Sequence, residues 1–190
     1  AYEMELKNRL GLDNKLLRNI TVKAQSNPER VVFAEADNYK VLKAAQFASE
    51  EAVAFPILLG NRKRIEAIIN EYALEFTDFE IVDTKSEEEQ DRRIAYGKAF
   101  FEKRKRKGFT EFESIQIMRE RNHFGAMMVE TGDADAMISG ATRNYKDVVR
   151  PALQTIGTQK DVKTIAGLYI LMTKRGPLFL ADTTINMDPT

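Results

Sequence analysis

The chain has 190 residues, of which 43% are hydrophobic and 31% charged, with 29 basic and 29 acidic side chains. This length predicts one domain, or one domain plus part of another, with enough apolar residues for a sizeable core. The balanced charge argues against a general nucleic-acid-binding protein, which would carry a basic excess. Because there is no cysteine, disulfides, thiolate metal sites and cysteine nucleophiles are excluded, and a cytoplasmic location is the simplest expectation.

The sequence does not suggest a membrane protein, since no stretch reaches the roughly 18 apolar residues that a transmembrane helix needs. Its first residues are mixed and charged, unlike a secretory signal. The start at Ala1 and the turn-like INMDPT at the end together predict a piece of a longer polypeptide. Removal of an initiator methionine would explain the start alone.

Helical and strand-like patterns alternate along most of the chain. The expected helices cover 13–26, 38–54, 61–73, 86–108 and 110–132, and a further one follows residue 142 and ends near 156. The expected strands cover 30–35, 56–59, 79–82 and 136–138. Start signals support three helices: Asp13 as a cap, and capping boxes at 86–89 and 110–113. Asn122 and His123 are expected to break the fifth helix, and Pro151 to kink or restart the last one.

This order predicts an α/β fold, a mostly parallel sheet covered by helices on both faces. Two β-prone runs at 164–172 and 177–181 then predict a hairpin that opens another domain. The expected divisions are a connector and N-terminal helix at 1–23, an α/β domain at 24–157, and the incomplete start of a second domain at 158–190.

The first candidate site is the small-residue loop that follows the strand at 136–138. A helix start just beyond such a loop offers N–H groups to an anion, which favours a phosphorylated small molecule as ligand. The same residues also suit a plain β–α turn, so both interpretations stay open. The loop consists of Ser139, Gly140, Ala141 and Thr142.

Two groups of cations are further candidates. The basic run at 103–107 suits a solvated helix end, or phosphate capture by one or two of its five side chains, because adjacent helix positions point in different directions. Arg150 stands directly before Pro151, where a restrained backbone suits a fixed binding role or a plain surface position.

Other polar residues carry weaker signals. His123 is the only histidine, so it is interpreted as a helix-end residue rather than a base or a metal ligand. Asp133 and Asp135 are interpreted as turn formers. Acids that follow strands are either functional or simple caps, and these are Glu35, Asp37 and Asp182. A packed helix face is expected for Met118, Met127 and Met128.

Several segments, in the same order along the chain, resemble phosphate acetyl/butyryl transferases. They are EADNYKVLKAA at 35–45, PILLGN at 56–61, E-x-R-K-x-K-G at 102–108, GDADAMISGAT, RPALQTIGT and FLADTTINMDP. The likeness covers roughly 24–190. VVFAEADNYKVLKAAQ and the connector-like YEMELKNRLGLDN are more similar to the version fused as the C-terminal part of bacterial NADP-dependent malic enzymes.

The resemblance implies two α/β domains like those of isocitrate and isopropylmalate dehydrogenases, with the site in the cleft between them. By motif, the family's ligand-binding arginines match Arg104 and Arg150, and its small-residue loop matches Ser139–Thr142. The family's catalytic serine–arginine pair and aspartate would lie after Thr190, so the residues present are expected to bind acetyl-CoA or acetyl phosphate.

Three functions follow as hypotheses. The first is a regulatory acyl-CoA or acyl-phosphate binding domain of a malic enzyme, with NADP and a divalent metal confined to the upstream domain. The second is a piece of a working phosphate acetyltransferase, and the third is an oligomerisation domain with a vestigial site. The resemblance implies a homo-oligomer, no metal or cofactor of this chain's own, and neither nucleic acid nor membrane as a partner.

Overall fold

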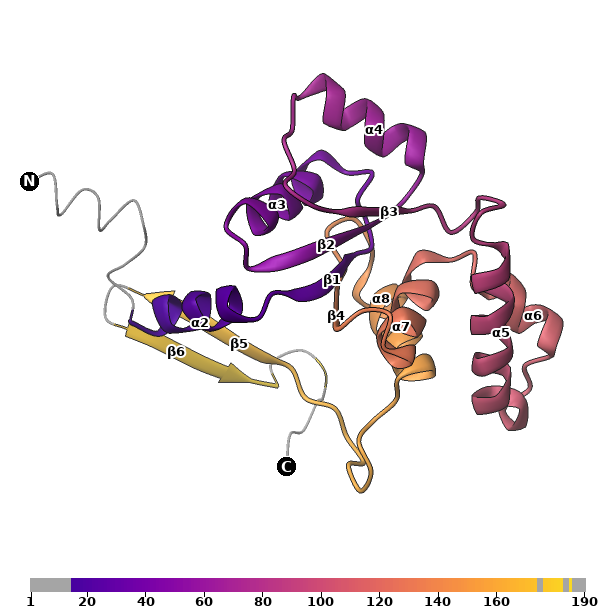
Figure 1. Cartoon of the computed structure of the whole chain (residues 1–190). Helices are drawn as coiled ribbons and strands as arrows, with labels where there is room; N and C mark the ends of the chain where they lie inside the picture. The colour runs from indigo at the N-terminus through magenta and orange to yellow at the C-terminus, as the bar shows by residue number, and fades with distance from the viewer. Residues whose placement is uncertain (1–14, 174–175, 183–184, 186–190) are drawn as a thin grey trace, which may run out of the picture. The chain divides into compact units, whose positions relative to one another are not determined.

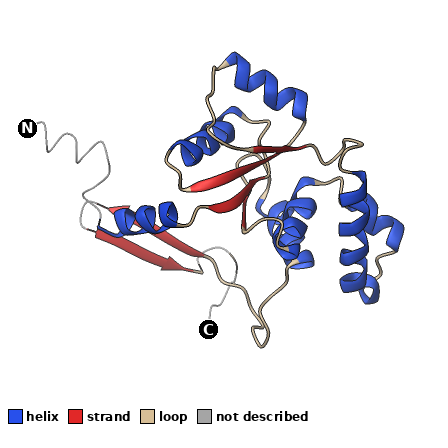
Figure 2. Ribbon diagram, viewed as in Figure 1, coloured by secondary structure: helices blue, strands red, loops and turns tan. Residues whose placement is uncertain are grey.

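The computed structural model describes residues 15–173, 176–182 and 185 (Figures 1 and 2). The chain divides into two compact units, one formed by 27–157 and the other by 1–26 together with 158–190. The expected cap Asp13, most of the expected connector and the turn at 174–175 lie outside the described residues. The domain boundaries drawn from the sequence stay a prediction.

A four-stranded parallel sheet forms the centre of the unit 27–157 (Figure 2). In the order β3-β2-β1-β4, its strands are β3 (Glu80–Val82), β2 (Ala54–Leu59), β1 (Glu29–Phe33) and β4 (Ala136–Ile138). Val31 of β1 pairs with Pro56 on one side and Ala136 on the other. Because all four strands run parallel, their carboxyl ends meet at one edge of the sheet. The expected parallel α/β arrangement is confirmed.

Helices cover both faces of this sheet (Figure 1). They are α3 (Tyr39–Glu50), α4 (Arg62–Glu71), α5 (Gln90–Arg104), α6 (Glu111–Ile117), α7 (Arg121–Thr131) and α8 (Tyr145–Thr155), with the 3-10 turn η1 (Lys105–Lys107) after α5. Asn38 caps α3 and Asn61 caps α4, each accepting a hydrogen bond from a main-chain N–H of the first turn. The predicted capping box at Thr110 and Glu113 is present at the start of α6.

Successive residues along the strands point to opposite faces of the sheet and pack into two separate hydrophobic cores. Val32 and Ile57 pack on one face with residues of α5 and α7, whereas Phe33 and Leu58 pack on the other with residues of α3 and α4. The first of these cores contains the three methionines expected on a packed face, Met118, Met127 and Met128.

The predicted capping box at 86–89 is wrong. Helix α5 begins only at Gln90, and its cap residue Glu89 makes no side-chain capping bond. The reason lies in Arg93, whose Nη1 donates to the main-chain carbonyl oxygens of Thr84 and Ser86. These bonds wrap the segment around a guanidinium group, so that it forms turns instead of a first helical turn.

The expected helix at 110–132 is indeed divided in two, but the break lies a few residues earlier than expected. Helix α6 ends at Ile117 and α7 starts at Arg121, so Asn122 and His123 lie in the first turn of α7. Helix α8 continues through Pro151. A proline removes the N–H that would reach the carbonyl four residues earlier, here that of Asp147. The Asn122 side chain donates to this carbonyl oxygen at 3.0 Å and replaces the missing bond.

The described part of the other unit contains helix α2 (Lys15–Ser26) and strands β5 (Leu168–Thr173) and β6 (Gly176–Ala181). The two strands pair antiparallel, with Leu168 opposite Ala181 and Thr173 opposite Gly176. The expected hairpin is therefore confirmed, although its turn lies outside the described residues. Whether it opens a second domain stays a prediction.

Candidate functional site

The loop that follows β4 closes around the carboxylate of Glu35. Strands β1 and β4 are neighbours, so Glu35, two residues beyond β1, lies beside the loop after β4. Its oxygens accept hydrogen bonds from the main-chain N–H groups of Gly140 at 2.6 Å and Thr142 at 2.5 Å. The hydroxyl groups of Ser139 and Thr142 also donate to it. The N–H groups of Gly140 and Thr142 are thus satisfied within the protein.

This arrangement fixes both the charge of Glu35 and the shape of the loop. Burial alone raises the pKa of Glu35, but the hydrogen bonds from Thr142, Gly140 and Ser139 outweigh it and hold the pKa below its ordinary value. Gly140 has a φ of +109°, in the left-handed region that glycine adopts without strain. The loop is therefore an anion cradle whose anion is the protein's own carboxylate.

Asn122 joins this loop to helix α8. Asn122 is only 2% exposed, and its Oδ1 lies 2.8 Å from the Ser139 hydroxyl, whose single hydrogen it shares with Glu35 at 3.1 Å. Its amide nitrogen donates to the carbonyl of Asp147, as described above. One amide therefore sets the position of the loop against the first turn of the helix that carries Arg150. Nothing local in the sequence indicates this role, because the two partners lie 17 and 25 residues away.

Arg104 and Arg150 line the same hollow, which has a volume of about 490 Å³. Arg104 is the last residue of α5 and is half-buried, and its Nε is buried without a hydrogen-bond partner in the described chain. Arg150 is exposed. The other lining residues belong to α8, and they are Tyr145, Lys146, Val149, Leu153 and Gln154. Two arginines from different helices thus meet at one hollow with mixed apolar and polar walls.

The basic run at 103–107 divides into different roles. Lys103 donates to the carbonyl oxygen of Thr155 at 2.9 Å and pairs with Glu130. Because the last carbonyls of a helix lack partners within the helix, this bond satisfies the end of α8 and ties it to the end of α5. Lys105 pairs with Glu102 on the surface. Of the five cations, Arg104 is the one that lines the shared hollow.

A second hollow of about 350 Å³ shares Lys146 and Arg150 with the first. It is also lined by Arg143 and by His123, whose ring is buried. Nδ1 of this ring lies 3.0 Å from a Glu120 carboxylate oxygen, and Nε2 lies 3.1 Å from the Gln154 amide oxygen. With both nitrogens engaged, His123 links α7 to α8, in agreement with its interpretation as a helix-end residue.

Asp37, another acid that follows β1, is held in an ion pair. Arg121 donates to it with both terminal nitrogens, at 2.6 and 2.8 Å. These bonds lower the pKa of Asp37 and raise that of Arg121. Asp135 similarly pairs with Arg30, which lowers the pKa of Asp135 to about 2. Both acids have structural partners, and the sequence did not indicate either arginine.

The structure therefore brings Arg104 and Arg150 together, while Ser139–Thr142 are not among the residues that line their two hollows. A ligand role for this loop, including Ala141, stays a prediction. Within the described ranges, no group of three or more acidic or histidine side chains could hold a metal ion. No helix in those ranges is both long and apolar enough for a membrane span.

Comparisons with known proteins give consistent results. Residues 15–190 match the family model described as phosphate acetyl/butaryl transferase. The phosphate acetyltransferase of Staphylococcus epidermidis is 32% identical over 171 residues, which are 90% of this chain and 51% of that protein. The NADP-dependent malic enzyme of Salmonella typhimurium is 33% identical over 195 residues, which cover 100% of this chain and 25% of that protein.

Solved structures agree with these relatives. A phosphotransacetylase from Streptococcus pyogenes superposes with a TM-score of 0.82 at 30% identity, covering 92% of this chain and 53% of its own. The EutD phosphotransacetylase from Staphylococcus aureus has a TM-score of 0.79 at 27% identity, covering 92% and 52%. The chain thus spans about half the length of these two phosphotransacetylases. It belongs to the phosphate acetyl/butaryl transferase family.

Proposed function

We propose that this chain is a phosphotransacetylase-like domain of an NADP-dependent malic enzyme, which binds acetyl-CoA or acetyl phosphate and regulates the oxidative decarboxylation of malate. The supporting observation is the hollow shared by Arg104 and Arg150. A planar guanidinium fork suits phosphate oxygens, and both ligands carry phosphate. The malic enzyme of Salmonella typhimurium, which aligns with all of this chain, favours that parent protein.

The described residues suggest how such a ligand is held. Arg104 and Arg150 both line the hollow, and a guanidinium group donates strong charge-assisted hydrogen bonds to phosphate oxygens. Glu35 already occupies the N–H groups of Gly140 and Thr142. In this conformation, anion recognition therefore rests on arginine side chains, and the loop acts by positioning α8.

Catalytic phosphate acetyltransfer is the second candidate, and it is favoured by the phosphate acetyltransferases among the relatives. In this reaction the coenzyme A thiol loses its proton and its sulfur bonds to the acetyl carbon. The bond from that carbon to the phosphate oxygen breaks, and phosphate leaves with the electron pair and takes up the proton. Fixed arginines would stabilise the leaving phosphate.

We further propose a two-domain, dehydrogenase-like architecture for the complete protein, with the β5–β6 hairpin opening the second domain. A homo-oligomer in the cytoplasm, with NADP and a divalent metal bound by the malic enzyme domain, completes this proposal.

Titration of acetyl-CoA into the full-length protein tests the regulatory function, with malate oxidation and heat of binding as readouts. We expect binding with a change in rate, and affinity reduced about tenfold or more in Arg104→Gln and Arg150→Gln, since each loses a charge-assisted bond to phosphate. Arg106→Gln, an exposed cation next to Arg104, serves as the matched control. No heat and no change in rate would refute the proposal.

Formation of acetyl-CoA from acetyl phosphate and coenzyme A by the same protein separates the two candidates. Turnover that depends on Arg104 and Arg150 would favour the catalytic function. Binding and regulation without turnover would favour the regulatory one.

A further inference from the structure

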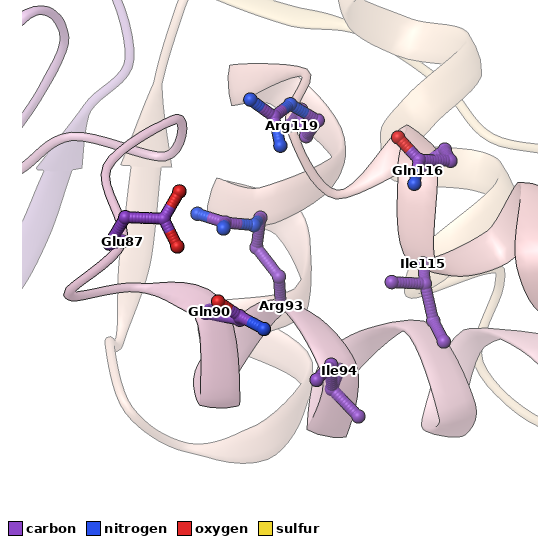
Figure 3. A pocket seen from close by; sticks show the side chains of 7 residues that line it. All are labelled: Glu87, Gln90, Arg93, Ile94, Ile115, Gln116 and Arg119. Carbon is purple, nitrogen blue, oxygen red and sulfur yellow. The ribbon is translucent and has the colours of Figure 1, made fainter.

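A separate hollow lies at the other end of α5 from Arg104, next to α6 (Figure 3). Its volume is about 260 Å³. This equals about nine water volumes of about 30 Å³ each, below the range of about 300–1,000 Å³ typical of sites for drug-sized ligands. Arg93 in this hollow and Arg104 are separated by roughly 16 Å along the helix at about 1.5 Å per residue. The hollow is thus distinct from the one assigned to an acyl ligand.

Arg93 is the main charged group of this hollow. It is only 5% exposed, and Nη1 donates to the carbonyl oxygens of Thr84, at 3.0 Å, and Ser86. These bonds hold the guanidinium in place but use only one of its nitrogens. No carboxylate of the described chain forms an ion pair with it. The nearby Glu89 carboxylate interacts with the charge of Arg93 without an ion-pair contact, so the guanidinium keeps its other nitrogens for the hollow that it lines.

Arg119 and Glu87 complete the charged lining. The carbonyl of Arg119 accepts the Thr84 hydroxyl at 3.0 Å, which holds its main chain beside the turn that Arg93 organises. In the described part of the molecule, neither the Arg119 guanidinium nor the Glu87 carboxylate takes part in an ion pair. Figure 3 shows the charged ends of Glu87 and Arg93 turned toward each other across the hollow. The Arg93 guanidinium thus faces one carboxylate, and Arg119 adds a second cation to the lining.

We propose that this hollow binds a small carboxylate that also carries a hydroxyl or ammonium group. The ligand carboxylate lies on Arg93 and Arg119, whose N–H groups suit paired oxygens. The ligand's donor lies on Glu87, which as a carboxylate can only accept. The amides of Gln90 and Gln116 supply further polar contacts at the wall.

Charge and size favour this class over other anions. The three charged lining groups carry one net positive charge, which balances a single carboxylate and not a phosphate dianion. A ligand without a donor would leave Glu87 facing the bound carboxylate with nothing between them, and two like charges at short distance repel. The lining therefore favours a ligand that carries both a carboxylate and a hydrogen-bond donor.

Calorimetric titration of the full chain with glycolate, L-serine, acetate and inorganic phosphate tests this proposal. We expect glycolate or L-serine to bind in the millimolar range or more tightly, and acetate and phosphate to bind more weakly. Arg119→Gln should reduce the affinity about tenfold or more, because it removes a charged partner of the carboxylate. Arg93 also organises the turn at 84–86, so its substitution is not the primary test.

Two further variants make the result decisive. Glu87→Gln should reduce the preference for glycolate over acetate, because it removes the repulsive charge. Arg106→Gln, the same change on an exposed cation near the other end of α5, should leave the affinity unchanged. Absence of binding by both glycolate and L-serine, equal binding of phosphate, or unchanged affinity in Arg119→Gln would overturn the proposal. Unchanged acetyl-CoA affinity in Arg119→Gln would show that the two hollows act separately.

Discussion

Replacement of Glu35 by glutamine tests whether the protein's own carboxylate holds the loop after β4. The carboxylate accepts hydrogen bonds from Gly140, from both the N–H and the hydroxyl of Thr142, and from Ser139. Glutamine keeps one acceptor oxygen and puts an NH₂ group in place of the other. With the oxygen toward Gly140, the NH₂ group faces the N–H of Thr142, and two donors meet without an acceptor.

The structure gives a rough magnitude for this change. Glu35 is 4% exposed, so water compensates little. A donor left without an acceptor costs about 1–3 kcal/mol, and loss of the charge weakens the remaining bonds by about 1 kcal/mol. We therefore expect Glu35→Gln to lower the free energy of unfolding by about 2–4 kcal/mol at neutral pH.

Urea denaturation measures the global effect, and amide hydrogen exchange at Gly140 and Thr142 measures the local one. Both amides should exchange faster in the variant. Glu66→Gln is the matched control, since Glu66 is an exposed residue of α4, and we expect its effect to stay within about 0.5 kcal/mol. Equal stability and unchanged exchange in Glu35→Gln would show that the carboxylate does not hold the loop.

We also expect the difference in unfolding free energy between wild type and Glu35→Gln to depend on pH. The pKa of Glu35 is lower in the folded protein than its ordinary value. Such a carboxyl adds stability that is complete above the unfolded pKa and is lost as the pH falls through the folded pKa. The difference between wild type and Glu35→Gln should therefore be constant near neutral pH and shrink in this acidic window. A difference that grows on acidification would contradict the assigned hydrogen bonds.

Two further substitutions probe the packing of the helices. Gly97→Ala should destabilise the protein by about 1–3 kcal/mol or more in thermal unfolding, because the added Cβ would lie 2.5 Å from the Cα of Ile115; a stabilisation, usual for this change within an exposed helix, would show that α5 and α6 are not in such close contact. Asn122→Ala should lower the free energy of unfolding by about 1–3 kcal/mol in wild type. The loss should be smaller in a Pro151→Ala background, because the restored N–H of residue 151 can donate to the carbonyl of Asp147. Equal losses in both backgrounds would show that the Asn122 side chain does not replace the missing helical bond.

Periodicity predicted the elements of the sheet and its helices, because strand and helix patterns depend on residues close together in the sequence. The sequence prediction failed at 86–89. Serine and glutamate there have the spacing of a capping box, but no capping box forms. Arg93 overrode it with bonds to two carbonyl oxygens of the same segment. At Pro151 the helical periodicity was correct, because α8 continues to Thr155. The fresh start that the proline suggested is absent, and an amide from another helix supplies the missing donor.

Less of the candidate site could be predicted from the sequence. The resemblance indicated Arg104 and Arg150, and the structure places both at one hollow. The bonds from Glu35 to the loop span 104 to 107 positions, and no local pattern shows which acid after a strand reaches which loop. A loop of small residues after a strand indicates an anion cradle equally well whether the anion is a ligand or a side chain of the protein.

This ambiguity bears on which groups of this chain are available to an anion. Glu35 and Asn122 satisfy their partners within the protein, and Lys103 ties the ends of α5 and α8 together. These bonds hold the scaffold, whereas Arg104 and Arg150 line one hollow and form no ion pair within the described residues. The charges of these two arginines are therefore available to an anion, whereas the loop N–H groups of Gly140 and Thr142 already have the Glu35 carboxylate as acceptor. The division between satisfied supports and free guanidinium groups is therefore what favours binding of an anion at the arginines over binding at the loop.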